Sequence, residues 1–271
     1  MKNLFDITGK VIVVSGSTGV LAGATAQYLA RQGAKIAFLG RHREKLDAAL
    51  KEASKTNDGC SAYVCDVLDA GSLRRANDAI LAKYGKIDVL VNGAGGNMPG
   101  AVIPPDKSFF DLDFSQWQQV LNLNLGGTVM SSIVFGRVFE AQKYGAIVNF
   151  SSMSATQALT RVLGYSNAKA GVDNFTRWLA TEFAKKIGDK IRVNAIAPGF
   201  FISEQNRALL TNPDGSLTER GSQVIAKTPF GRFGEAEDIF GTMHFLCSDA
   251  SAFLTGAIIP VDGGFSCFCG V

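Results

Sequence analysis

The chain has 271 residues, of which 46% are apolar and 19% are charged, and its formal net charge is +3. This apolar content can fill a large core, which excludes intrinsic disorder, and the small, scattered positive excess argues against a nucleic-acid-binding surface. No stretch approaches the roughly 18 consecutive apolar residues of a membrane helix, and the first residues do not read as an export signal.

Short apolar runs alternate with amphipathic stretches along the whole sequence. The runs are nearly continuous in Val, Ile and Leu, which indicates strands covered on both faces and therefore a parallel sheet. We predict strands at 11–14, 36–39, 87–91, 146–150, 191–196 and 257–261, and helices at 21–31, 44–55, 72–83, 115–142, 166–187 and 235–248. This alternation predicts one α/β domain over residues 1–271, a doubly wound Rossmann-type parallel sheet flanked by helices on both faces.

Two long segments, at about 96–112 and 200–233, break this alternation. The first is rich in Pro and Gly, and the second contains a predicted helix at 204–210, a turn at 212–215 and another short helix. Both follow strands and should overhang the carboxyl edge of the sheet, where such folds bind ligands. Long segments at that edge are usually functional, so we expect both to be substrate loops.

A glycine-containing turn lies between the first strand and the first helix. Glycines there let the backbone approach a pyrophosphate, whose charge meets the N-terminus of the helix. The spacing is G-x-x-G-x-x-x-G rather than the stricter G-x-G-x-x-G, so the evidence for the motif is its position between a strand and a helix. The residues expected to bind the cofactor here are Gly16, Ser17, Thr18, Gly19, Val20 and Leu21.

The end of the second strand bears on the choice of cofactor. A fold that selects NAD normally places Asp or Glu there to hold the ribose 2′-hydroxyl, whereas this sequence has Gly40, followed by Arg41 and Arg43. A guanidinium attracts a 2′-phosphate and binds it with two hydrogen bonds. We therefore favour NADP(H), with NAD(H) as the alternative. The arginines could also be no more than a solvated helix start.

Residues after the next two strands extend the expected cofactor site. Asp66, beside Val67, could accept a hydrogen bond from the adenine amino group. Asn92, Gly93 and Ala94 offer a floor of small residues for the adenosine ribose. Each residue is unremarkable by itself, but their occurrence at the ends of successive strands indicates a cofactor site.

Tyr165 and Lys169 are four residues apart, which places them one turn apart on one helical face. A tyrosine with a pKa of about 10 is a poor base, but a nearby ammonium and an oxidised nicotinamide both favour the phenolate. Tyr165 could thus exchange a proton with a carbinol oxygen. Ser152, just beyond the predicted strand at 146–150, could hold the same oxygen as charge develops, and Asn124 could support a water chain returning protons to Lys169.

The spacing Ser-x(12)-Tyr-x(3)-Lys, downstream of the turn and of Asn-Gly-Ala-Gly, resembles the short-chain dehydrogenase/reductase family over essentially the whole chain. The resemblance implies hydride transfer at the nicotinamide C4 and a catalytic tetrad of Asn124, Ser152, Tyr165 and Lys169. It also implies cofactor contacts from Tyr165 and Lys169 to the nicotinamide ribose, and from the segment containing Pro198, Gly199 and Phe201 to the carboxamide. Ser15, Val20 and Ala22 depart from the family pattern, so we expect a turn of different shape.

Within the family the sequence is most similar to the D-mannonate oxidoreductase (fructuronate reductase) branch, in segments 92–97, 151–153, 197–202, 204–210, 231–234 and 262–266. A sugar acid needs a cation for its carboxylate and amides for its hydroxyl groups. The candidate substrate-binding residues are Asn97, Ser152, Arg161, Gln205, Asn206 and Arg207. This branch implies NAD, in conflict with Arg41. The alternatives are another keto-sugar or small carbonyl compound, a hydroxysteroid-like alcohol, or a non-catalytic nucleotide-sensing protein.

The histidine and cysteine content argues against a hydrolase, a disulfide framework and a zinc site. With two histidines and no Gly-x-Ser-x-Gly, a Ser-His-Asp hydrolase is disfavoured. Five irregularly spaced cysteines suit neither a disulfide framework nor a zinc site, so we expect reduced thiols in the cytoplasm and no metal. The apolar tail at 265–271 is expected to pack on a neighbouring subunit of a homotetramer or dimer. A frayed end is the alternative.

Overall fold

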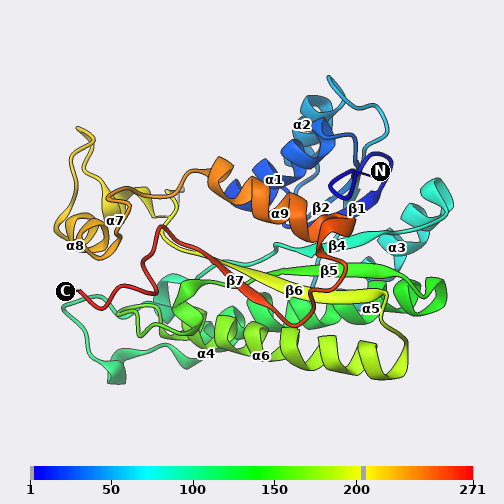
Figure 1. Ribbon diagram of the computed structural model, residues 1–271. Helices are drawn as coiled ribbons and strands as arrows, with labels where there is room; N and C mark the ends of the chain where they lie inside the picture. The colour runs from blue at the N-terminus through cyan, green and yellow to red at the C-terminus, as the bar shows by residue number, and fades with distance from the viewer. Residues whose placement is uncertain (1–2, 203–205, 271) are drawn as a thin grey trace.

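The computed structural model describes residues 3–202 and 206–270 (Figure 1). Its sheet has seven strands in the order β3-β2-β1-β4-β5-β6-β7, and all neighbouring pairs are parallel. The strands are β1 Val11–Ser15, β2 Lys35–Gly40, β3 Ser61–Val64, β4 Val89–Asn92, β5 Gly145–Phe150, β6 Ile191–Pro198 and β7 Ile258–Val261. The strand order reverses between β1 and β4, which opens the ligand crevice of a doubly wound sheet at the carboxyl ends of these two strands.

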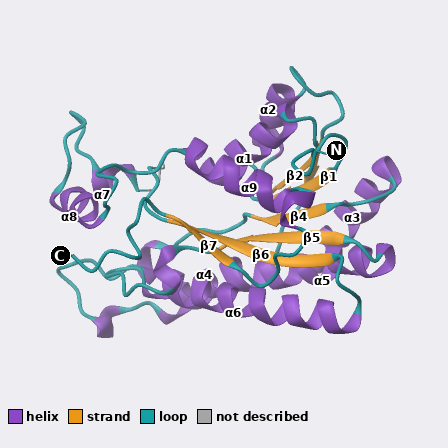
Figure 2. Cartoon of the chain, viewed as in Figure 1, coloured by secondary structure: helices purple, strands orange, loops and turns teal. Residues whose placement is uncertain are grey.

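Helices cover both faces of the sheet, as Figure 2 shows. The α-helices are α1 Val20–Arg31, α2 Arg43–Ala53, α3 Ala70–Tyr84, α4 Phe114–Leu121, α5 Gly127–Gln142, α6 Leu163–Lys186, α7 Arg207–Leu210, α8 Glu219–Lys227 and α9 Phe240–Cys247. One core joins the sheet to α1, α2 and α9, and a second joins its other face to α3, α5 and α6. Ile12 and Val14 of β1 belong to the first core, and Val11 and Val13 belong to the second. Because β1 is buried on both faces, its apolar run is continuous.

The predicted fold class is confirmed, but several element boundaries differ. Strand β3 is absent from the predicted apolar runs, because this edge strand is half-exposed and Val64 is 50% exposed. The predicted helix at 115–142 is two helices joined by a π-helical turn, Asn122–Gly126. The last predicted helix is a 3-10 turn at Ala236–Ile239 followed by α9. Neither helix interruption is visible in the hydrophobic period, which changes little when one turn gains or loses a residue.

The segment at 200–233 carries α7, a turn closed by a hydrogen bond from Gly215 N to Asn212 O (3.0 Å), and α8. Figure 1 shows α7 and α8 standing beyond the end of β6, at the carboxyl edge. The predicted helix at 204–210 is present over 207–210, and its first two positions lie outside the described residues. The segment at 96–112 contains 3-10 turns at Pro99–Ala101 and Phe109–Asp111.

The C-terminal tail packs on its own chain over part of its length. Phe265 is 6% exposed and lies edge-on to Phe200, with ring centroids 5.3 Å apart. This corrects the expectation that the whole tail seeks a neighbouring subunit. Cys60, Cys65 and Cys247 are buried, and Cys267 and Cys269 are exposed. Within the described part of the chain, no helix is long and apolar enough to span a membrane.

Candidate active site

The turn after β1 packs directly against the loop after β4. Gly16 has φ +65°, and a Cβ atom on it would lie 2.6 Å from the carbonyl oxygen of Gly93. The Ser15 hydroxyl accepts hydrogen bonds from the backbone N–H groups of Gly93 (3.2 Å) and Ala94 (3.4 Å). Ser15, which departs from the family pattern, therefore joins the two predicted cofactor-binding loops.

The N-terminus of α1 suits a phosphate group. Gly19 occupies the N-cap position, no side chain caps the helix there, and Gly19 and Val20 are exposed. Gly23, one turn into the helix, passes so close to Ser17 that a Cβ atom would lie 2.9 Å from the Ser17 carbonyl oxygen. The first N–H groups of a helix have no intrahelical partner, and with the helix dipole they attract a pyrophosphate. Despite Val20 and Ala22, the turn thus fits a dinucleotide.

The two arginines after β2 differ in their surroundings. Arg43 begins α2 and its Nε donates to Asp47 Oδ2 at 3.0 Å, so its charge is partly matched. Arg41 is exposed and forms no ion pair with a carboxylate in residues 3–202 and 206–270. Gly40 lies beside the turn, since a Cβ atom on it would be 3.5 Å from the Thr18 side chain. Because Gly40 ends β2 beside this turn, the next residue, Arg41, lies close to the expected phosphate site.

The other predicted cofactor residues lie at the ends of β3, β4 and β6. Asp66 Oδ1 accepts from the N–H of Leu68 (2.9 Å) and is half-buried, and Val67 is buried. The Asn92 amide donates to Ser132 Oγ (3.1 Å) and Asn149 Oδ1 (2.9 Å), so its side chain joins β4 to β5 and α5. Pro198 ends β6, Gly199 N donates to Val261 O (3.0 Å), and Phe201 is buried.

Tyr165 and Lys169 lie together on α6, as their spacing predicts. The Lys169 Nζ lies 5.4 Å from the centroid of the Tyr165 ring and donates to the carbonyl oxygen of Phe150 at 2.7 Å. Lys169 is 4% exposed, and burial lowers its pKa to about 8, against an opposing effect of Asp173. The lysine is therefore a buried amine fastened to the end of β5.

Ser152 follows β5 directly, is 9% exposed and accepts a hydrogen bond from Ser154 N at 3.2 Å. Burial raises the pKa of Tyr165, and the Ser152 side chain opposes this by a hydrogen bond. The sequence led us to expect a pKa lowered by the ammonium. In the chain alone, desolvation of the phenolate outweighs its partners, so the phenol stays protonated at neutral pH.

Asn124 is fully buried in the π-helical turn between α4 and α5. Its amide donates to Gly96 O (2.7 Å) and Val120 O (2.9 Å), and its oxygen accepts from Gly96 N (3.2 Å). A Cβ atom on Gly95 would lie 2.5 Å from Asn124 Oδ1 and 3.5 Å from Lys169 Nζ. Asn124 and Lys169 therefore converge on Gly95, in the loop after β4.

Sequence reasoning missed Asp173. This residue is 3% exposed, one turn beyond Lys169, and accepts a hydrogen bond from the Ser151 hydroxyl. Burial raises its pKa, against Ser151, Arg177 and Lys169. Lys169 and Asp173 thus attach α6 to two consecutive residues of the β5 end. The sequence could have indicated Asp173, because it follows Tyr165 and Lys169 at the same interval of four residues and so shares their helical face.

The predicted substrate residues are only partly brought together. Arg161 lines a cavity of about 370 Å³ with Ser154 and Ser166, and Asn97 is half-buried with its side-chain oxygen bonded to Met98 N (2.9 Å). The Asn206 amide donates to Phe201 O (2.8 Å), and Arg207 is exposed. Gln205 lies outside the described residues.

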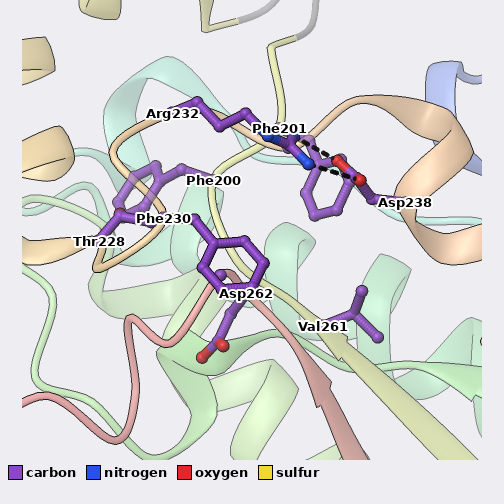
Figure 3. Close-up of a pocket in the computed structure, with 10 residues that line it drawn as sticks. Phe200, Phe201, Thr228, Phe230, Arg232, Asp238, Val261 and Asp262 are labelled. Carbon is purple, nitrogen blue, oxygen red and sulfur yellow. Dashed lines mark hydrogen bonds and ion pairs between the residues drawn. The ribbon is translucent and has the colours of Figure 1, made fainter.

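A second cavity, of about 140 Å³, lies between the ends of β6 and β7 and the segment after α8 (Figure 3). Arg232 and Asp238 form an ion pair at its rim, with Nη1 and Oδ2 2.6 Å apart, which lowers the pKa of Asp238 to about 2. None of the four predicted tetrad residues lines either cavity. Tyr165, Lys169 and Ser152 therefore define the site better than the cavities do.

Known proteins similar to this chain are oxidoreductases. A family model described as enoyl-(acyl carrier protein) reductase matches residues 17–266. The chain is 44% identical over 275 residues to the uncharacterized oxidoreductase UxuB of Bacillus subtilis, covering 98% of each chain. It is 34% identical over 263 residues to the D-threitol dehydrogenase of Mycolicibacterium smegmatis, covering 97% of this chain and 95% of that protein.

Two solved structures are similar over nearly their whole length. One is a proposed D-mannonate oxidoreductase from Haemophilus influenza with bound NAD, with a TM-score of 0.91 and 39% identity, covering 99% of this chain and 100% of that chain. The other is a proposed gluconate dehydrogenase from Agrobacterium tumefaciens, with a TM-score of 0.87 and 31% identity, covering 98% and 100%.

Proposed function

This chain belongs to the short-chain dehydrogenase/reductase family and is an NAD(P)-dependent oxidoreductase, and from that premise we propose that it interconverts a secondary alcohol and a ketone on a sugar acid such as D-mannonate/D-fructuronate. The observation that carries the reaction type is the buried Lys169 amine, 5.4 Å from the Tyr165 ring centroid at the end of β5. The substrate class is supported by Arg161 in the cavity of about 370 Å³ and by what the two solved structures are named for.

Four residues of the chain divide the catalytic work in this proposal. A bound nicotinamide supplies the hydride acceptor or donor at C4. Tyr165 gives its proton to the carbonyl oxygen during reduction and takes it back during oxidation. Ser152 donates a hydrogen bond to that oxygen as charge develops. The Lys169 ammonium favours the phenolate and holds the ribose, and Asn124 orders the water that returns the proton.

Asp173 acts in this scheme by keeping Lys169 charged. Changing Asp173→Asn removes the carboxylate that opposes burial, so the pKa of Lys169 should fall below its present value of about 8. The ammonium would then be lost at lower pH, moving the alkaline limb of the kcat/KM profile to lower pH and reducing activity at pH 8 several-fold. Ser151→Ala, which leaves the carboxylate in place, should move that limb less. If the alkaline limb of the kcat/KM profile does not move in Asp173→Asn, Asp173 does not keep Lys169 charged.

We favour NADP(H) as the cofactor, with NAD(H) as the alternative that the bound NAD of one structural relative supports. The preference rests on Arg41, which is exposed and free of an acidic partner among the described residues, beside Gly40 and Thr18. Arg41→Ala should weaken NADPH binding at least about tenfold and NADH binding little, because a charge-assisted contact to the 2′-phosphate is lost. Calorimetric titration measures both. Arg43→Ala, whose charge is matched by Asp47, is the control, and equal losses for both cofactors would refute the preference.

The substrate proposal is tested by measuring oxidation of NADPH and NADH with a panel of hexuronates, neutral keto-sugars and a hydroxysteroid ketone. Turnover confined to the hexuronates supports the proposal. Turnover of neutral keto-sugars or other small carbonyl compounds instead would establish the alternative enzyme. Cofactor binding without any turnover would favour a nucleotide-sensing protein.

We propose one domain over residues 1–271, with substrate loops at about 96–112 and 200–233. We also propose a cytoplasmic homo-oligomer, a tetramer or dimer, that binds a small molecule and neither nucleic acid nor membrane. Assembly is supported by Ile133 of α5 and Trp178 of α6, each 58% exposed. The two helices are neighbours, because a Cβ atom on Gly136 of α5 would lie 3.2 Å from the Phe183 ring of α6.

A further inference from the structure

Two of the side chains that line the cavity of about 370 Å³ are hydroxyls without a hydrogen-bond partner. It lies between Ile103, the segment from Ser154 to Leu163 and one face of α6. The hydroxyl oxygens of Ser154 and Ser166 are buried and have no hydrogen-bond partner among the described residues, and Ser154 is 3% exposed. Buried polar groups are normally hydrogen-bonded, so these two hydroxyls indicate a polar ligand. No residue of the predicted tetrad lines this cavity, but Ser154 N donates to Ser152 Oγ, so the cavity lies next to Ser152.

Arg161, at the rim of this cavity, has a strained backbone. Its φ is +76°, which is rare for a residue with a Cβ atom. Its carbonyl oxygen accepts a hydrogen bond from Ile103 N at 2.9 Å, so the segment at 96–112 helps to hold it there. Such strain persists where the surroundings impose it, and it concentrates at functional sites.

A second guanidinium, that of Arg220 in α8, bonds Thr160, the residue before Arg161, although Arg220 itself does not line the cavity. Arg220 Nη1 donates to Thr160 Oγ1 (3.2 Å), and Nη2 donates to Thr160 O (3.4 Å). Burial lowers the pKa of Arg220, and Arg161 lowers it further, since the two cations repel each other. No carboxylate forms an ion pair with either arginine within the described parts of the chain. Two cations that repel each other and have no carboxylate partner favour the binding of an anion.

We propose that Arg161 and Arg220 together bind the carboxylate of the acidic substrate, with the Ser154 and Ser166 hydroxyls bonding its hydroxyl groups. The inference rests on the proposed sugar-acid function and adds Arg220 as a residue that selects for a charged substrate. A planar guanidinium pair matches a carboxylate through parallel hydrogen bonds. Three segments, at 96–112, 153–162 and α8, then meet on the ligand, which explains why the α7–α8 segment overhangs this edge.

The test compares two ligands that differ in one group, D-gluconate and D-glucitol, titrated calorimetrically into the chain saturated with cofactor. Wild type should bind D-gluconate at least about tenfold more tightly than Arg220→Ala does. D-Glucitol, which lacks the carboxylate, should bind both alike. Arg220→Lys, which keeps the charge without the planar fork, should be intermediate. Arg31→Ala, at an exposed arginine in the last turn of α1, should match wild type.

Equal affinity of wild type and Arg220→Ala for D-gluconate would overturn the inference, as would equal loss for the neutral ligand. If circular dichroism shows that Arg220→Ala is misfolded, the affinities of Arg220→Lys for D-gluconate and D-glucitol are compared with those of wild type instead. Binding and turnover are separate readouts. If Arg220→Ala selectively weakens D-gluconate binding but the protein turns over no hexuronate, the anion site is supported and the proposed function is refuted. If the protein turns over hexuronates but Arg220→Ala binds D-gluconate as wild type does, the proposed function is supported and the anion site is refuted.

Discussion

Tyr165→Phe is expected to reduce kcat by roughly a thousandfold, a typical value for loss of a general acid–base group, while cofactor affinity changes little. The substitution removes one oxygen from a half-buried ring and leaves the 2.7 Å bond from Lys169 to Phe150 O in place. Steady-state rates of NADPH or NADH oxidation measure the first quantity, and calorimetric cofactor titration measures the second.

The matched control is Tyr84→Phe. The Tyr84 hydroxyl donates to Gly59 O at 2.8 Å, far from the tetrad along the chain, and its removal should cost about 1 kcal/mol of stability without changing kcat. The pH dependence gives a second check. Because burial raises the pKa of Tyr165, carbonyl reduction finds the phenol protonated at neutral pH. Alcohol oxidation should accelerate as pH rises, until the Lys169 ammonium is lost near its pKa of about 8. Substantial turnover by Tyr165→Phe would exclude the phenol as the proton donor.

Gly16→Ala is expected to damage both stability and cofactor binding. At φ +65°, a side chain costs about 1–2 kcal/mol. The new Cβ atom would also lie 2.6 Å from the Gly93 carbonyl oxygen, and overpacking of this kind costs about 1–3 kcal/mol more. Relief of the contact must separate the turn after β1 from the loop after β4, so cofactor affinity should fall more than about tenfold.

Gly85→Ala separates the two causes. Gly85 ends α3 with φ +73° and has nothing within 4 Å of an added Cβ atom, so it shares the backbone strain without the collision. Urea denaturation of both variants and of wild type measures the difference in the free energy of unfolding. Cofactor titration should show normal affinity for Gly85→Ala. Equal destabilisation of the two variants, with unchanged cofactor binding in Gly16→Ala, would show that the two loops are not rigidly joined.

The sequence was sufficient for the parallel α/β fold and for the pairing of Tyr165 with Lys169. Both follow from local periodicity: strands buried on two faces read as continuous apolar runs, and residues four apart share a helical face. Edge strand β3 and the π-helical turn at Asn122–Gly126 escaped the same reasoning. An exposed edge carries little apolar signal, and one extra residue in a helical turn barely disturbs the period.

Long-range contacts explain what local patterns left open. Asp173 meets Ser151 because α6 packs beside the end of β5, and Arg220 meets Thr160 because α8 folds back over the carboxyl edge. Likewise Phe265 packs on Phe200 of its own chain rather than facing outward. Spacing along a chain specifies neighbours within one helix or strand. Contacts between residues 22, 60 or 65 positions apart depend on how whole elements pack, and burial and pKa shifts follow from that packing.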